Sequence, residues 1–235
     1  RPSEWKGIRW CPLRGCCKPG ERLVMSYIAV VDYGVGNLKS VSNAFAYLGI
    51  ETKITGDPDE LELAQAIVLP GVGAFPDAAE KLRATGLDQA VVKQGRKKPV
   101  LGICLGMQLL LDRGEEVRPC PGLGVIKGVC ARIPTEEKLP HIGWNSLTFP
   151  NRSPLFEGVD EGSYVYFVHS FSAQHTDPDQ VSAVSQYGVP VIAAVQNGNF
   201  FGCQFHPEKS GRPGLKILSN FYEWCMARSA GGRVC

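Results

Sequence analysis

The sequence lacks several patterns that would assign it to other classes of protein. It has no pair of cysteines at CxxC spacing, no apolar run near the ~18 residues that a membrane-spanning helix needs, and no apolar segment typical of a secretory signal. Internal repeats and low-complexity tracts are missing as well. These absences favour a reduced, cytoplasmic protein over a secreted or membrane protein.

The chain also carries little net charge. Its 25 basic and 23 acidic residues give a formal charge of +2, and residues 1–24 alone hold +4, which leaves −2 for residues 25–235. Nucleic-acid binding usually needs a basic stripe, so we expect no DNA or RNA partner. With 235 residues, 44% of them hydrophobic, one substantial domain is expected.

The nine cysteines are odd in number and mostly isolated, which does not suit a disulfide framework. Three of them fall within residues 1–24, a stretch of Trp, Pro, Gly and Arg without helical or strand period. No second ligand cluster accompanies them, so an unstructured or added leader is favoured over a metal fragment. We therefore expect no metal or organic cofactor, a leader over 1–24 and one domain over 25–235.

Apolar runs alternate with helical patterns in the first half of the chain. Four segments predict strands: 27–32, 51–55, 66–69 and 99–103, of which the first and the last have the form of buried strands. Between them we expect a helix that Asn37 caps and Gly49 stops, a short acidic helix, a helix from Asp77 and one through 107–111. The alternation predicts an α/β fold with a doubly wound, mostly parallel sheet flanked by helices.

Beyond Cys120 the pattern becomes strand-rich. Strands are expected near 122–133, 164–168, 181–186, 191–196 and 200–205, before a last helix over 213–227. We expect these strands to form an added, partly antiparallel portion of the same sheet.

The segment Gly102-Ile103-Cys104-Leu105-Gly106-Met107-Gln108 has the form of a nucleophile elbow with cysteine as the nucleophile. Such a turn needs small residues two before and two after the nucleophile, and Gly102 and Gly106 meet that need. The first turn of the following helix would favour a thiolate at Cys104. Taken alone, the pattern suits a buried core cysteine equally well.

Of four histidines, only His206 is followed two residues later by glutamate at the end of a predicted strand. If the backbone stays extended, which Pro207 favours, His206 and Glu208 lie on the same side. Glu208 could then orient the imidazole while its other nitrogen serves Cys104. Together the two signals favour a catalytic triad of Cys104, His206 and Glu208 over a surface or core histidine.

The turn Pro70-Gly71-Val72-Gly73 follows another predicted parallel strand. Ligands bind beyond the carboxyl ends of such strands, so this turn, the elbow and the histidine should converge on one crevice. The backbone N–H groups of Gly71 to Gly73 and of Leu105 could hold the oxyanion of a tetrahedral intermediate. An ordinary turn between strand and helix would explain the glycines equally well.

The motifs PGVG, GICLGMQ and FHPE together resemble the class I, triad-type glutamine amidotransferases, over essentially all of residues 25–235. The segments DYGVGNL (32–38), PHIGWN (140–145), YFVHS (166–170) and HPEKS (206–210) narrow the resemblance to the glutaminase subunits of imidazole glycerol phosphate synthase. The resemblance implies a flavodoxin-like fold and cysteine-dependent hydrolysis of glutamine without a cofactor.

The resemblance also implies roles for single residues. The triad positions are matched by Cys104, His206 and Glu208, and the oxyanion loop by Gly71, Val72 and Gly73. The positions that hold glutamine are matched by Gln108, Ser170 and Phe171, where relatives often have Tyr in place of Phe171. The face toward the partner is matched by Asn37, Trp144, Tyr166 and Lys209. By their residue type alone, Trp144 and Tyr166 could equally be core aromatics.

The implied partner is a (β/α)8 barrel cyclase, which forms a heterodimer with the glutaminase, takes up its ammonia and makes imidazole glycerol phosphate and AICAR in histidine biosynthesis. The alternatives are a glutaminase of anthranilate, guanylate or pyridoxal phosphate synthesis, a hydrolase of another γ-glutamyl amide or a peptide, and a catalytically silent binding protein. The DYGVGN and PHIGWN segments argue against the first two alternatives, and the intact triad argues against the third.

Overall fold

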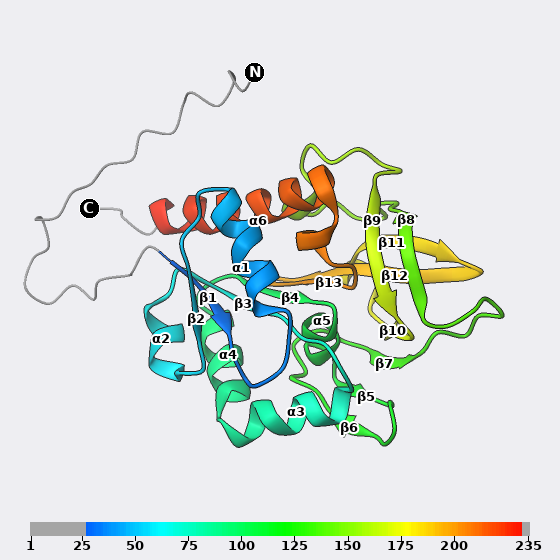
Figure 1. Ribbon diagram of the computed structural model, residues 1–235, viewed down its shortest axis with the longest axis horizontal. Coiled ribbons are helices and arrows are strands. Elements are labelled where there is room, and N and C mark those ends of the chain that lie inside the picture. Colours follow the sequence, from blue (N-terminus) through cyan, green and yellow to red (C-terminus); the bar gives the residue numbers. More distant parts are fainter. Residues whose placement is uncertain (1–26, 232–235) are drawn as a thin grey trace, which may run out of the picture.

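The computed structural model describes residues 27–231, so the leader expected over 1–24 lies outside the described residues. Its main sheet has seven strands in the order β11-β12-β13-β4-β3-β1-β2 (Figure 1). In that order the bounds are β11 (Val181–Tyr187), β12 (Val189–Asn197), β13 (Phe200–Cys203), β4 (Val100–Ile103), β3 (Ala66–Leu69), β1 (Ile28–Val31) and β2 (Thr52–Thr55). Five strands, from β13 to β2, run parallel to one another. Strand β12 pairs antiparallel with β13, and β11 pairs antiparallel with β12.

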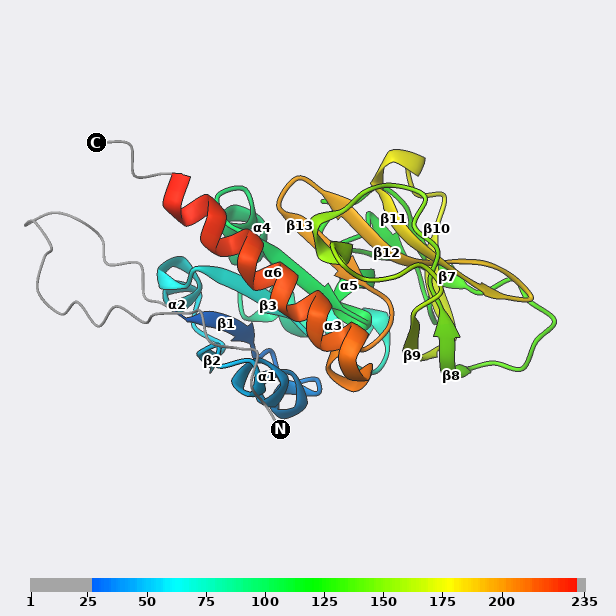
Figure 2. The same cartoon turned by 90° about the horizontal axis from the view of Figure 1, so that it is seen from above.

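Helices cover both faces of this sheet (Figures 1 and 2). One face carries α1 (Leu38–Tyr47) and α6 (Gly211–Gly231), and the other carries α2 (Pro58–Leu63), α3 (Phe75–Ala84), α4 (Leu87–Gly95) and α5 (Leu105–Leu109). Alternate residues of β1 enter opposite cores, because Ala29 and Val31 pack on the side of α3 while Ile28 and Val30 pack on the side of α1. The predicted doubly wound α/β fold is confirmed.

The strand-rich second half differs from the prediction, because part of it leaves the main sheet. A four-stranded sheet contains β10 (Phe171–Gln174), β7 (Val129–Arg132), β5 (Arg113–Gly114) and β6 (Cys120–Pro121), and a hairpin-like pair contains β8 (His141–Ser146) and β9 (Tyr164–His169). The strands expected near 122–133 and 164–168 therefore do not extend the main sheet. Instead β7 and β10 bury Cys130 and Ala173 in the same core cluster as residues of α5.

Smaller differences concern element ends. The helix expected from Asp77 begins at Phe75 and is followed by a second helix, α4, because Gly86 has a φ of +70° that no helix continues. Strand β8 was not expected. Short 3-10 turns, η1 (Pro154–Phe156), η2 (Pro178–Gln180) and η3 (Pro207–Lys209), complete the described chain. Within it, no helix is both long and apolar enough to cross a membrane.

The convergence of the predicted site loops follows from the strand order. Strands β1, β3, β4 and β13 are parallel neighbours, so the loops after all four leave the sheet at one edge. Those loops are the segments DYGVGN, PGVG, the cysteine turn and the QFHPE segment. Ligand sites of open α/β sheets lie at this edge.

Candidate active site

Cys104 occupies a strained turn between β4 and α5. Its φ of 54° and ψ of −111° are unusual for a residue with a side chain, and its N–H donates to Cys203 O at 2.7 Å. The predicted need for glycines is confirmed: a Cβ at Gly106 would lie 1.7 Å from Leu69 O, and one at Gly102 would lie 2.7 Å from the backbone of Gly106. The local sequence therefore fixes the elbow.

The His206 and Glu208 side chains meet directly. Glu208 Oε1 lies 2.8 Å from His206 Nδ1, and both side chains are almost fully buried. The backbone between them is not the continued strand that we expected, because Pro207 starts the 3-10 turn η3. A proline φ suits the first position of a helical turn as well as a strand, and the turn brings the carboxylate beneath the imidazole.

The second ring nitrogen of the histidine points to the cysteine side. His206 Nε2 is buried and has no partner that meets ordinary hydrogen-bond geometry. Burial lowers the pKa of the imidazole, but the neighbouring Cys104 sulfur and the Glu208 carboxylate outweigh burial and raise the pKa of His206 to about 9. A protonated imidazole beside a cysteine is the arrangement that stabilises a thiolate and can protonate a leaving group.

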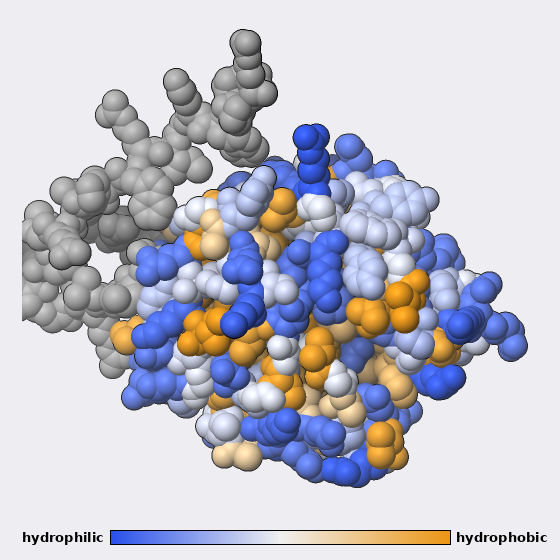
Figure 3. Space-filling view, in the orientation of Figure 1, coloured by the Kyte–Doolittle hydropathy of each residue, from blue (hydrophilic) through white to orange (hydrophobic). Residues whose placement is uncertain are grey.

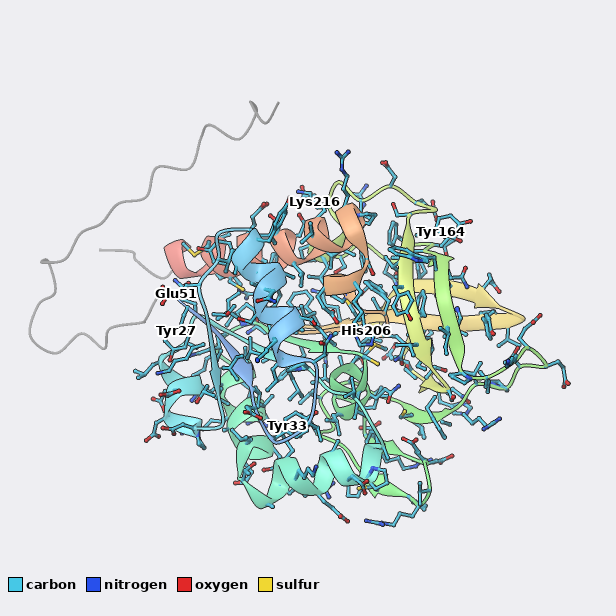
Figure 4. All side chains as sticks on the ribbon, in the orientation of Figure 1. Tyr27, Tyr33, Glu51, Tyr164, His206 and Lys216 are labelled. Atoms are coloured by element: carbon cyan, nitrogen blue, oxygen red, sulfur yellow. The ribbon has the colours of Figure 1, made fainter. Side chains whose placement is uncertain are left out.

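Strand β9 and Ser210 fix the backbone of the histidine. The N–H of His206 donates to Tyr166 O at 2.9 Å, and the hydroxyl of Ser210 donates to His206 O at 2.6 Å. The same hydroxyl accepts a hydrogen bond from the N–H of Tyr166 at 3.0 Å. Figure 4 shows His206 near the middle of the molecule, between α5 and the turn that leads into α6. The imidazole is therefore held from the β9 side as well as by Glu208.

The glycine turn after β3 lies against the elbow. A Cβ at Gly71 would come within 3.0 Å of the Leu105 side chain and 2.6 Å of the Tyr33 hydroxyl. Tyr33, labelled in Figure 4, donates its hydroxyl to Pro70 O at 2.9 Å and thereby ties the loop after β1 to this turn. Val72 is 43% exposed and Gly73 has a φ of +101°, so the outer half of the turn projects to the surface.

Comparisons with known proteins agree with this geometry. The family model described as "Glutamine amidotransferase class-I" matches residues 29–224. The chain belongs to the class I glutamine amidotransferases. Members of this family are enzymes that release ammonia from glutamine through a cysteine thioester, and this amidotransferase is one of them.

Curated relatives place the amidotransferase in a narrower group. It is 47% identical over 197 residues to the imidazole glycerol phosphate synthase subunit HisH of Caldanaerobacter subterraneus subsp. tengcongensis, covering 83% of this chain and 97% of the relative. It is also 47% identical over 196 residues to the HisH subunit of Bacillus cereus, covering 83% and 93% of the two chains.

Solved structures agree on the fold. A protein from Thermoplasma acidophilum, described as a component of GMP synthase, superposes with a TM-score of 0.68 at 21% identity, covering 89% of this chain and 98% of that one. PurLQS from Thermotoga maritima gives a TM-score of 0.67 at 24% identity, covering 85% and 99%.

The residues expected to hold glutamine line the same edge of this amidotransferase. Gln108 is 5% exposed and donates through Nε2 to Phe171 O at 3.0 Å, next to the half-buried Ser170. His169 Nδ1 contacts the same carbonyl oxygen at 2.8 Å. The Phe171 backbone is thus fixed from two sides, and its position does not depend on a tyrosine hydroxyl.

All four residues expected to face a partner lie outside the core, and Asn37 is half-buried. Trp144 is 55% exposed, Tyr166 is half-buried, and their rings meet edge to face with centroids 6.1 Å apart, while Lys209 is exposed. Tyr164 and Ile142, each 60% exposed, extend the apolar surface of β8 and β9. Figure 3 shows apolar surface reaching this side of the molecule, and Figure 4 shows Tyr164 at its outer edge. The core interpretation of Trp144 is therefore wrong.

Asn37 differs from the expectation that its side chain caps a helix. It stands at the N-cap position of α1, but its side chain makes no capping hydrogen bond. Instead Asn37 Nδ2 donates to Glu208 Oε1 at 2.8 Å. The residue therefore contacts the triad carboxylate directly.

Three residues of the site were not predicted from the sequence: Tyr33, Gln204 and Ser210. Each is a polar side chain buried to at least 96% at the end of a strand or in a turn. For Gln204 a signal existed, because a glutamine directly after the apolar run FFGC needs hydrogen-bond partners once it is buried. Between residues 27 and 231, no group of three or more His, Cys, Asp or Glu side chains could hold a metal ion.

Proposed function

We propose that this chain is the glutaminase subunit of imidazole glycerol phosphate synthase, with Cys104 as nucleophile, His206 as acid and base, and Glu208 as the residue that orients the imidazole. The observation that carries the site is the His206 Nδ1 to Glu208 Oε1 bond of 2.8 Å beside a strained Cys104. The 47% identity to HisH subunits supports the pathway.

In the first half-reaction, the Cys104 thiolate attacks the side-chain amide carbon of glutamine, and a carbon–sulfur bond forms. The negative charge that develops on the amide oxygen is held by N–H groups of Gly71 to Gly73 and of Leu105, where one such donor is typically worth ~2.7 to 4 kcal/mol. His206 donates its proton to the departing nitrogen as the carbon–nitrogen bond breaks. Ammonia leaves and a γ-glutamyl thioester remains.

In the second half-reaction, neutral His206 takes a proton from water, whose oxygen attacks the thioester carbon. The carbon–sulfur bond breaks, glutamate leaves, and the Cys104 thiolate and the His206 imidazolium are restored. Glu208 accepts the Nδ1 hydrogen throughout and stabilises the positive ring. Gln108, Ser170 and the backbone of Phe171 hold the amino-acid end of glutamine.

The ammonia passes to a (β/α)8 barrel cyclase in a cytoplasmic heterodimer, whose lyase reaction yields imidazole glycerol phosphate and AICAR. The docking face consists of Trp144, Tyr166, Lys209 and the segment near Asn37. Aromatic anchors of this type are frequent at the centres of interfaces. Because free ammonia is mostly protonated at neutral pH and lost to solvent, we expect the isolated glutaminase to hydrolyse glutamine only weakly.

The test is glutamate release from glutamine by the purified chain, first alone and then with a cyclase barrel and its nucleotide ligand. Strong stimulation by the barrel would support both the chemistry and the pathway. High activity without the barrel, or none with it, would contradict the assignment to histidine biosynthesis. Parallel assays with the acceptor subunits of anthranilate, guanylate and pyridoxal phosphate synthesis identify the alternative in that case.

A further inference from the structure

A fully buried glutamine lies beside the catalytic cysteine. Gln204 follows directly after β13 and is 0% exposed. Strand β13 pairs in parallel with β4 so that Cys203 is level with Ile103. Gln204 is the next residue after β13, and Cys104 is the next residue after β4. The two residues therefore leave the sheet side by side, and Gln204 Nε2 lies 3.8 Å from Cys104 Sγ.

The hydrogen bonds around Gln204 determine which way its amide faces. Gln108 Nε2 donates to the carbonyl oxygen of Phe171, which can only accept, so the nitrogen of the Gln108 amide is fixed. The same nitrogen lies 3.0 Å from Gln204 Oε1. A flipped Gln204 would set two N–H donors against each other, so Gln204 must present its oxygen to Gln108 and its N–H to the sulfur.

An N–H that faces sulfur favours the thiolate over the thiol, since a hydrogen bond to an ionised acceptor is stronger than one to a neutral acceptor. The helix after Cys104 cannot supply this stabilisation alone. Helix α5 has only five residues, so it carries a small dipole. Among the residues that the structure describes, His206 and Gln204 are side chains beside Cys104 that favour a negative sulfur.

We propose that Gln204 is a positioning residue of the reaction: its N–H holds the Cys104 sulfur as a thiolate, and its carbonyl oxygen holds the amide of Gln108. This inference rests on the proposed function, in which Cys104 is the nucleophile and Gln108 binds glutamine. One buried amide then links the attacking atom to the substrate-binding residue, so that the position of the sulfur and the position of glutamine are set together.

The test measures the rate at which iodoacetamide alkylates Cys104 as a function of pH, with peptide mass spectrometry to assign the modified cysteine. Burial raises the pKa of the Cys130, Cys203 and Cys225 thiols, so these cysteines react at higher pH. Alkylation reports the state of the sulfur without glutamine, so its result stands even if the chain proves not to be a glutaminase.

Two variants separate the donor from its packing. Gln204→Glu keeps the shape and the oxygen that accepts from Gln108, but replaces the N–H by a carboxylate oxygen, whereas Gln204→Met removes both polar groups. We expect the alkylation midpoint to rise by about one pH unit in Gln204→Met and by more in Gln204→Glu, where the added charge repels the thiolate.

The matched control is Gln94→Met, since Gln94 is another buried glutamine, 3% exposed, whose Nε2 lies 3.4 Å from Glu62 Oε2 in α2. Its midpoint should equal that of the wild type. An unchanged midpoint in folded Gln204 variants, with folding checked by thermal unfolding, would overturn the proposal. Loss of folding in both Gln204 variants would assign the residue to the stability of the core, which also contradicts the proposal.

Discussion

Asn37 Nδ2 lies 2.8 Å from Glu208 Oε1, so two residues 171 positions apart in the chain share a hydrogen bond. The same oxygen accepts from His206 Nδ1, whereas the second carboxylate oxygen of Glu208 is buried without a partner. Asn37 therefore supplies one of only two hydrogen bonds that hold this carboxylate within the described residues, and it does so from the segment expected to face the cyclase.

We expect Asn37→Ala to lower the kcat of glutamine hydrolysis by the isolated chain roughly tenfold, because a hydrogen bond to a buried charged group is lost. Asn37→Asp should cost more, since it sets a second carboxylate beside Glu208. Steady-state kinetics at saturating glutamine, without a partner, measure the effect on the triad rather than on docking. A wild-type kcat in Asn37→Ala would show that the bond does not position Glu208.

The positive φ of Cys104 makes a prediction that separates activity from stability. Cys104→Ala and Cys104→Ser should abolish glutamate release and leave the fold intact. Cys104→Gly should also be inactive, yet more stable than Cys104→Ala by about 1 kcal/mol, because glycine adopts the turn without strain. Urea unfolding of the three variants gives the comparison, and ammonia release by any of them at the wild-type rate would refute Cys104 as the nucleophile.

Gly106 tolerates no side chain. A Cβ there would lie 1.7 Å from the carbonyl oxygen of Leu69, which is backbone and cannot move aside. Gly106→Ala should therefore lower the free energy of unfolding by about 3 kcal/mol. Gly49→Ala is the control: Gly49 has a positive φ, at +75°, but open space around it, so the substitution should cost only about 1 kcal/mol.

His169 should make the fold sensitive to mild acid. Desolvation is the main reason why the pKa of His169 falls to about 4, with the nearby His141 and His206 adding to the decrease. An unfolded histidine has a pKa of about 6.5, so the unfolded chain binds more protons between these values. The contribution of His169 to stability is therefore fully present above pH 6.5 and falls by up to about 3 kcal/mol as the pH drops toward 4.

The variant His169→Asn tests this dependence, since it retains an N–H for Phe171 O but does not titrate. Its unfolding free energy should vary less than that of the wild type between pH 6.5 and 4.5. Equal slopes in the two proteins would show that acid sensitivity arises from other groups.

Trp144 should anchor the cyclase. Replacing a half-exposed tryptophan at the centre of an interface typically costs at least 2 kcal/mol, so Trp144→Ala should raise the Kd for the barrel by about thirtyfold. Tyr47→Ala serves as the control because Tyr47 is 79% exposed at the far end of α1. Calorimetric titration with the barrel measures the Kd of each variant. An equal Kd for Trp144→Ala and Tyr47→Ala would exclude the β8–β9 face as the docking surface.

The sequence allowed the elbow and the parallel sheet to be predicted because both depend on local rules. Buried apolar runs define β1, β3 and β4, and the glycines on either side of Cys104 are required by the crowding of a single turn. The predicted contact between His206 and Glu208 is present, although through a 3-10 turn, because proline permits either backbone.

The remaining features depend on which strands pair, and alternation alone does not encode pairing. The separation of β7 and β10 from the main sheet follows from their mutual register, with Ala173 opposite Cys130. The contact of Gln204 with Cys104 depends on the alignment of β13 with β4, and that of Asn37 with Glu208 joins the two ends of the domain. No local pattern in the chain predicts either contact.

The place of β13 between β4 and β12 has a consequence for how the chain is made. Strand β4 pairs on one side with β3, which precedes it, but on the other side with a strand about 100 residues later. At usual rates of translation the ribosome needs roughly 5 to 20 s to add that length. During this interval the strand leading to Cys104 presents an unpaired edge, which is where nascent chains aggregate. Chaperones that shield sheet edges should therefore act on this protein late in its synthesis, and active enzyme should form only after Glu208 has left the ribosome.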